Sequence, residues 1–302
     1  GLGKMSTIDS GKINWTNNKK GVILNVKTDQ VLKVDIQNAN QNYSWYRKIV
    51  EPGVLLTDIT DSLQFQYTHK QKDLIDFNVQ KLLPHKFSEY GPALAAGDVN
   101  SDSLEDIVVG GNSTQGAMIL LQQPSGKFIK KILPQPTQTD STFQSLDMGI
   151  SLFDADGDVD LDIYIASGGY IAPGNSTTYR DKFYINDGKG NFTIDTTALP
   201  QNFTRKSCVR VADFDRDGDL DLFIAGRVDP GKYPRPVSSF IYRNDSKNGI
   251  IKFTDVTNTV AKSLNDVGMV CDAVWTDFDN DGWMDLVLAG EWMPIKFLKN
   301  DK

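Results

Sequence analysis

A nine-residue, aspartate-rich segment recurs four times in this chain, and this repetition constrains the fold more than any other feature. The four copies begin at residues 98, 154, 213 and 277 and align without gaps. A spacing of about 60 residues is typical of repeat architectures built from small groups of elements. One such unit cannot bury its apolar residues alone, so the repetition predicts a stack of similar units.

The segments around each copy have the composition of β-strands. A short apolar run closed by Gly or Ser follows each copy directly, at residues 107–111, 163–167, 222–226 and 286–290. These runs are rich in β-branched and aromatic residues, which indicates buried strands. One strand candidate precedes each copy and two more follow it. Four strands in about 60 residues is the size of one β-propeller blade.

These observations predict an all-β protein. Residues 91–302 hold about three and a half blades of a larger β-propeller, because the fourth unit ends after its third strand candidate at 295–298. Residues 1–38 have a different texture, with strand candidates at 13–15, 21–26 and 31–36, and we expect a small N-terminal β domain fragment there. Residues 39–90 are expected to form a connector that packs on the propeller.

The repeated segment has the chemistry of a calcium loop. Calcium takes six to eight oxygen ligands, which side chains at positions 1, 3, 5 and 9 and the backbone carbonyl at position 7 can supply. An EF-hand is excluded, because it needs a glutamate at position 12 and flanking helices. The predicted ligands are Asp98, Asn100, Asp102, Leu104 and Asp106; Asp154, Asp156, Asp158, Asp160 and Asp162; Asp213, Asp215, Asp217, Asp219 and Asp221; and Asp277, Asp279, Asp281, Trp283 and Asp285.

Position 6 of the loop must turn sharply, which favours glycine. Gly218 and Gly282 meet this requirement and Ser103 is acceptable, whereas Val159 is β-branched and resists a positive φ. We therefore rank the third and fourth loops as the best sites, the first next and the second last, with Gly157 able to relieve the second. A single loop of this kind could be a solvated turn, but four aligned copies predict up to four structural calcium ions.

The charge of the chain agrees with metal loops. The formal net charge is -7, and 18 of the 39 acidic side chains lie in the four loops. There is no basic excess of the kind that neutralises phosphates, so a nucleic-acid partner is not expected. No apolar run is long enough for a transmembrane helix. Two cysteines, Cys208 and Cys271, fall on equivalent strands of adjacent units, and they can be free thiols or a disulfide.

With these residues in view, residues 91–302 resemble the FG-GAP repeats, also called VCBS repeats, of integrin-alpha-like β-propellers. Residues 1–36 resemble the C-terminal half of an ASPIC/UnbV domain, through Gly1-Leu2-Gly3, Ile13-Asn14-Trp15 and Gln30-Val31-Leu32. The combination is similar to surface proteins of Bacteroidetes-type bacteria and to cartilage acidic protein. The chain departs from the pattern at Ser103 and Val159, where the family has glycine.

The resemblance implies an extracellular or cell-surface location, bound calcium, and a surface protein or glycan as partner. Some bacterial members accompany outer-membrane nutrient transporters, so the partner can include such a complex. We expect a binding or scaffold module and no enzyme activity. The alternatives are a glycan-cleaving propeller enzyme and a purely structural spacer between surface domains.

Loops that follow the second strand of each unit lie at the end opposite the calcium loops. They combine aromatic residues with arginine, which suits stacking on sugar rings or anchoring a protein. The candidate ligand residues are Tyr170, Tyr179, Arg180, Tyr233, Arg235 and Trp292. The competing interpretation is that these residues only pack the long loops.

Overall fold

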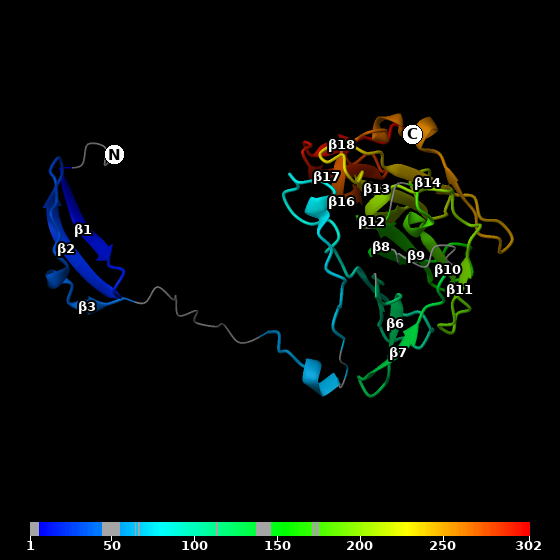
Figure 1. Cartoon of the computed structure of the whole chain (residues 1–302), viewed down its shortest axis with the longest axis horizontal. Helices are drawn as coiled ribbons and strands as arrows, with labels where there is room; N and C mark the ends of the chain where they lie inside the picture. Colours follow the sequence, from blue (N-terminus) through cyan, green and yellow to red (C-terminus); the bar gives the residue numbers. More distant parts are fainter. Residues whose placement is uncertain are drawn as a thin grey trace. The chain divides into compact units, whose positions relative to one another are not determined.

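The computed structural model describes residues 6–43, 55–63, 65, 67–112, 114–136, 146–170, 172 and 175–302. In this part of the chain almost all regular structure is β-strand, arranged in five antiparallel sheets (Figure 1). The chain divides into two compact units, Gly1–Asp58 and Ile59–Lys302. No helix among the described residues is long and apolar enough to cross a membrane.

The first unit contains one three-stranded sheet in the order β1-β2-β3. Its strands are β1 (Thr7–Asn14), β2 (Lys19–Lys27) and β3 (Gln41–Asn42). The second predicted strand, at residues 21–26, is confirmed within β2, whereas the first, at residues 13–15, overlaps only the end of β1.

The third predicted strand, at residues 31–36, is wrong. Residues 31–35 are irregular, Val31 is 90% exposed, and the 3-10 turn η1 (Ile36–Asn38) follows. Asp35 caps this turn by accepting a hydrogen bond from the Gln37 backbone N–H at 2.9 Å. Since β3 pairs with the start of β2 instead, the apolar run at 31–36 has no sheet edge to join.

The second unit contains four sheets, which we call blades 1 to 4, and this confirms the predicted all-β, propeller-like fold. In each blade the strands are neighbours in chain order. They are β4 (Leu94–Gly97), β5 (Asp106–Val109), β6 (Met118–Gln122) and β7 (Phe128–Ile132); β8 (Leu146–Phe153), β9 (Asp162–Gly168), β10 (Lys182–Ile185) and β11 (Thr193–Asp195); β12 (Arg205–Ala212), β13 (Asp221–Val228), β14 (Phe240–Asn244) and β15 (Phe253–Asp255); and β16 (Met269–Thr276), β17 (Asp285–Glu291) and β18 (Lys296–Leu298).

Short helical turns lie between the strands of this unit. They are η2 (Thr60–Leu63), η3 (Asp76–Asn78), η4 (Thr177–Tyr179), α1 (Thr257–Val260) and η5 (Lys262–Leu264). None is longer than four residues, so packing of the sheets against one another supplies the core.

The core lies between the faces of adjacent blades. Phe153 and Tyr164 of blade 2 pack in one cluster with Leu222 and Tyr242 of blade 3. Equivalent clusters join blade 1 to blade 2 and blade 3 to blade 4. Each blade therefore gains its buried surface from its neighbours, as expected for stacked repeats.

Residues 59–90 belong to the same unit as the blades. Phe87 is buried, and its ring stacks on Tyr170 at a centroid distance of 5.7 Å. Phe65 and Tyr67 pack against a cluster formed by β5 and β6. The unit boundary lies between Asp58 and Ile59, whereas the predicted domain limits at 38/39 and 90/91 remain predictions.

The two cysteines lie on equivalent strands, β12 and β16, as the repeat alignment predicts. Both are free thiols; Cys208 is buried and Cys271 is exposed.

Candidate metal loops and ligand face

Each aspartate-rich segment connects the first strand of a blade to the second, and its ninth residue begins that second strand. The four aspartates at position 9 are almost completely buried. In the third loop, Asp221 Oδ2 accepts the Phe214 N–H at 3.2 Å and Oδ1 accepts the Asn244 N–H at 2.8 Å. Asp106, Asp162 and Asp285 accept the corresponding hydrogen bonds. Position 9 thus ties the loop to the third strand of its own blade.

The aspartates at positions 1 and 5 close the loop around its centre. The position 5 carboxylate accepts the N–H of position 7 in every copy, as from Asp219 to Asp217 at 3.0 Å. The position 1 carboxylate accepts N–H groups from positions 4 to 6, as from Val159 to Asp154 at 2.8 Å. All four copies therefore share one backbone arrangement.

Two residues in each loop have a left-handed backbone. Position 6 has a positive φ in all four loops, including +75° at Val159. Position 4 also has a positive φ in all four loops. In the second loop the glycine, Gly157 with a φ of +82°, stands at position 4 instead of position 6. Val159 thus adopts the conformation that its side chain disfavours, and the loop around it keeps the shared hydrogen bonds. The requirement at position 4 was not recognised in the sequence.

The oxygen atoms of three loops are placed to hold a cation. The carboxylate oxygens of three groups lie within 4.8 Å of one another: Asp154, Asp156 and Asp158; Asp213, Asp215 and Asp221; and Asp277, Asp279 and Asp285. In the third loop, Oδ1 of Asp213 and Oδ1 of Asp215 are buried without a hydrogen-bond partner. Buried anionic oxygens need a donor or a cation, so the third loop fits a calcium ion best.

The first and fourth loops differ from this arrangement. In the first, the Asn100 amide donates to Asp102 Oδ2 at 3.0 Å, in place of a third clustered acid. In the fourth, the Lys299 ammonium contacts Asp279 Oδ2 and lies 3.3 Å from Asp281 Oδ2. Lys299 therefore forms ion pairs with two of the carboxylates that would bind a calcium ion.

Burial and mutual repulsion disfavour the ionised form of several loop carboxyls. Burial, partly offset by backbone hydrogen bonds, raises the pKa of Asp162 and of Asp221 to about 7. Burial and the neighbouring acids raise the pKa of Asp160 to about 6. A bound dication would favour the charged forms, so metal binding and ionisation are coupled at these loops.

The predicted ligand residues differ in their exposure. Tyr170, Tyr179 and Tyr233 are buried, and their hydroxyls bond within the structure or, for Tyr233, lie near Glu291. These three side chains pack inside the loops, as the competing interpretation of the sequence described. Arg235 is exposed, Arg180 is half-exposed, and Trp292 is 77% exposed with its indole N–H donated to the Tyr233 hydroxyl. The segment 171–174 of the blade 2 loop lies largely outside the described residues.

Three asparagines that the sequence reasoning missed hold neighbouring blades together. Asn186, Asn244 and Asn300 each follow or end the third strand of a blade. Each donates its side-chain amide to the position 2 carbonyl of the preceding blade's metal loop, at 2.8, 2.9 and 2.8 Å. Their recurrence in step with the loops was a signal available in the sequence.

The comparisons with known proteins agree with a repeat of this kind. Residues 154–224, which span the second and third metal loops, match the family model described as an FG-GAP-like repeat. A search of curated protein sequences found no match.

Two solved structures are similar in part. One is an Agrocybe aegerita lectin described as recognising non-reducing terminal N-acetylglucosamine, at 18% identity and a TM-score of 0.43, over 70% of this chain and 50% of the lectin. The other is the V. cholerae biofilm matrix protein Bap1, at 16% identity and a TM-score of 0.27, over 66% of this chain and 29% of that protein. The chain thus spans half or less of the length of either structure.

Proposed function

We propose that this chain is a calcium-stabilised binding module that works at the cell surface and recognises a protein or a glycan. The observation that carries the proposal is the third metal loop, where the buried oxygens of Asp213 and Asp215 have no hydrogen-bond partner. A structural ion at the loop ends supports a rigid stack of blades, and such scaffolds present binding loops at their surface.

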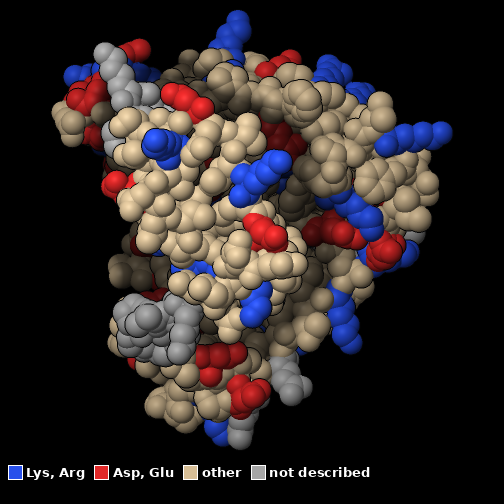
Figure 2. Space-filling view, turned by 90° about the vertical axis from the view of Figure 1, so that its left-hand side faces the viewer, with Lys and Arg blue, Asp and Glu red and all other residues tan. Residues whose placement is uncertain are grey.

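The proposed binding surface is the loop face opposite the metal loops. Arg180, Arg235 and Trp292 are the predicted ligand residues that this face exposes. An exposed indole and exposed arginines on one face suit a sugar ring or a protein hot spot. On the face shown in Figure 2, lysine and arginine side chains are interspersed with aspartate and glutamate, so a nucleic-acid partner is not part of the proposal.

The proposal assigns no reaction to the chain. The metal-loop carboxylates already serve backbone N–H groups, as at Asp221, and are the predicted calcium ligands. The finer parts of the proposal are an ASPIC/UnbV-like domain at residues 1–36 and a role as accessory subunit of an outer-membrane uptake complex. Both rest on resemblance alone.

Affinity purification from native membranes tests this function. The full-length protein is captured in calcium and in EDTA, and co-purifying proteins are identified by mass spectrometry, with a glycan array run in parallel. A partner or glycan held only in calcium is expected.

Trp292→Ala should weaken capture without changing the melting temperature, whereas Tyr233→Ala should lower that temperature because Tyr233 is in the core. Absence of any calcium-dependent partner and any array signal would refute the proposal.

A further inference from the structure

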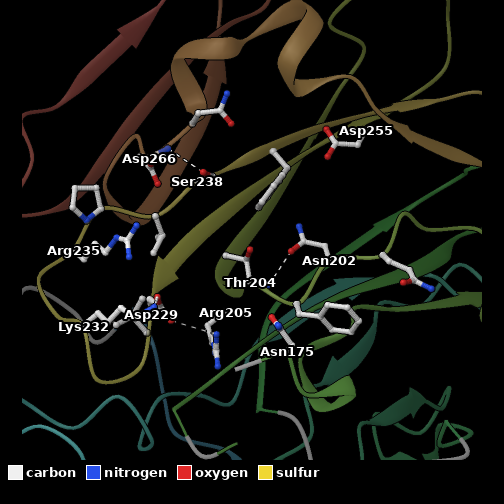
Figure 3. A pocket seen from close by; sticks show the side chains of 17 residues that line it. Asn175, Asn202, Thr204, Arg205, Asp229, Lys232, Arg235, Ser238, Asp255 and Asp266 are labelled. Atoms are coloured by element: carbon white, nitrogen blue, oxygen red, sulfur yellow. Dashed lines mark hydrogen bonds and ion pairs between the residues drawn. The ribbon is translucent and has the colours of Figure 1, made fainter. Parts of the chain in front are cut away.

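A polar pocket of about 570 Å³ opens beside blade 3 on the loop face. Its lining comes from residues 201–205 where β12 begins, from several residues between 228 and 238 where β13 ends, and from Asn265 and Asp266 before β16 (Figure 3). The volume lies in the range of ligand pockets, roughly 300 to 1,000 Å³. The pocket is therefore large enough for a small organic ligand.

Arg205 forms part of the pocket wall and is only 6% exposed. Its guanidinium lies over the Tyr179 ring at 4.1 Å, and its Nη1 is 3.7 Å from Asp229 Oδ1. The Nε and Nη2 atoms are buried without a hydrogen-bond partner. A buried guanidinium with two unused donors is costly, and a planar oxyanion that entered from the pocket and displaced the atoms covering Nε and Nη2 would satisfy both.

Two further cations lie at the same end of the pocket (Figure 3). The Lys232 ammonium pairs with Asp229 Oδ2 at 2.8 Å, so one carboxylate is shared between Lys232 and Arg205. Arg235 is exposed at the rim. Three cations against Asp229 and Asp266 still leave this end of the pocket with an excess of positive charge (Figure 3).

The described lining of the pocket has two acids besides Asp229, and both are exposed. Asp255 lies across the pocket from Arg205, whereas Asp266 lies on the same side as Arg235 (Figure 3). Asp255 Oδ1 also accepts the Thr257 N–H at 3.0 Å. A ligand with one anionic group is thus oriented with that group toward Arg205.

The rest of the lining suits a hydroxyl-rich ligand. The amides of Asn175, Gln201 and Asn265 are exposed along it, and each offers both a donor and an acceptor. Phe203 is half-buried in the lining, and an aromatic ring can stack on the apolar face of a sugar. A protein hot spot needs a desolvated apolar centre, which this amide-lined pocket does not provide.

We infer that this pocket binds a saccharide that carries a carboxylate, as uronic and sialic acids do. The carboxylate lies at Arg205, Lys232 and Arg235, and the ring hydroxyls bond to the amides. This inference rests on the proposed binding function and names its ligand class.

Calorimetric titration of the full chain in calcium tests the inference. The probes are oligosaccharides ending in uronic or sialic acid and their carboxyl-reduced counterparts, in which a neutral hydroxymethyl group replaces the carboxylate. At least one acidic probe is expected to bind, and its reduced counterpart to bind at least about tenfold more weakly, since a charge-assisted pair is lost.

Variants locate the site. Arg235→Gln should weaken the acidic probe about tenfold, because an exposed rim cation is removed without disturbing the core. Arg205→Lys should do the same, since lysine keeps the charge but loses the planar fork. Lys252→Gln, at an exposed position outside the pocket, is the matched control and should bind normally. If Arg205→Lys does not fold, Arg235→Gln decides alone.

Three outcomes would overturn the inference: no acidic probe binds, the reduced counterpart binds equally well, or Arg235→Gln has no effect. In each case a calcium-dependent partner or a neutral glycan on the array would leave the proposed binding function standing. The two proposals can therefore fail separately.

Discussion

The Asn244 side-chain amide donates a hydrogen bond to the Ala155 carbonyl at 2.9 Å, across the interface between blade 3 and the metal loop of blade 2. The Asn244 backbone N–H donates at the same time to Asp221 in the metal loop of its own blade. One buried asparagine thus joins two aspartate-rich loops. The same hydrogen bond recurs at Asn186 and Asn300, so each of these asparagines links the loop of one blade to the next blade.

Asn244→Ala should lower the free energy of unfolding by about 1–3 kcal/mol, because the Ala155 carbonyl loses its donor in a buried position. Urea denaturation in calcium measures the change. Asn258→Ala, at an exposed position, is the control and should stay within about 0.5 kcal/mol of the parent. Equal stability of Asn244→Ala and the parent would show that this bond does not hold the blades together.

Asp215→Asn should remove one calcium ion from the protein. Asp215 contributes a buried, unpartnered oxygen to the third loop, and the amide replaces a charged ligand with a neutral one. We expect a lower calcium stoichiometry by calorimetry and a melting temperature about 5 °C lower in calcium. The difference in melting temperature should disappear in EDTA, where the loop holds no ion. A loss of the same size in EDTA would mean that the carboxylate acts without calcium.

The stability of the metal-free protein should fall as the pH rises from about 4 to 7. The folded-state pKa of Asp162 and of Asp221 is about 7, above the unfolded value of about 3.9. The folded state then binds protons more tightly than the unfolded state, so unfolding becomes easier as those protons leave. Urea midpoints in EDTA at pH 5 and pH 8 measure this, and Asp221→Asn should flatten the dependence.

Calcium affinity, unlike the stability of the metal-free protein, should rise as the pH rises through about 7. Protons and calcium compete for the same carboxylates, so the affinity increases as the protons leave. Calorimetry at pH 6 and pH 8 measures the two affinities. An affinity that does not change between these values would contradict the link between Asp162, Asp221 and the ion.

Lys299→Ala should strengthen calcium binding at the fourth loop by about threefold to tenfold, since the ammonium competes for Asp279 and Asp281. Terbium luminescence sensitised by Trp283, at position 7 of this loop, reports on the site selectively. Lys296→Ala, on β18 outside the loop contacts, is the control. Weaker binding in Lys299→Ala would show that the lysine organises the loop instead of competing for it.

Val159→Gly should stabilise the protein by about 1 kcal/mol, because a β-branched residue at a φ of +75° carries the cost of the left-handed region. The reverse change, Gly218→Val at a φ of +97°, should destabilise it by a similar or larger amount. Thermal unfolding of both variants gives the comparison. A destabilised Val159→Gly protein would show that the valine side chain has a packing role despite its exposure.

The periodic features of this chain could be predicted from its sequence alone. The loop residues recur with oxygen side chains at fixed positions, and each copy is followed by a short apolar run, so the strands β5, β9, β13 and β17 and the blade architecture were predictable. Local chemistry was enough here, because the second strand of a blade starts where its aspartate-rich loop ends. The prediction of a strand at residues 31–36 was wrong, because this segment has no repeat to support it. Apolar composition alone does not provide a neighbouring strand to pair with.

Only the tertiary structure decided which side chains face solvent. Tyr170, Tyr179 and Tyr233 have the composition of a binding surface, yet all three are buried. Leu83, Phe87 and Tyr90 pack against Tyr170 and Tyr233, and Arg205 covers the ring of Tyr179. Arg205 lies at the start of β12 and carries no motif, yet it forms part of the wall of a pocket to which the distant residues 228–240 and 265–266 also contribute. The sequence determined the spacing of the repeats and of the candidate ligand residues. Which side chains are buried, and which distant loops lie together, depends on long-range packing that no local pattern encodes.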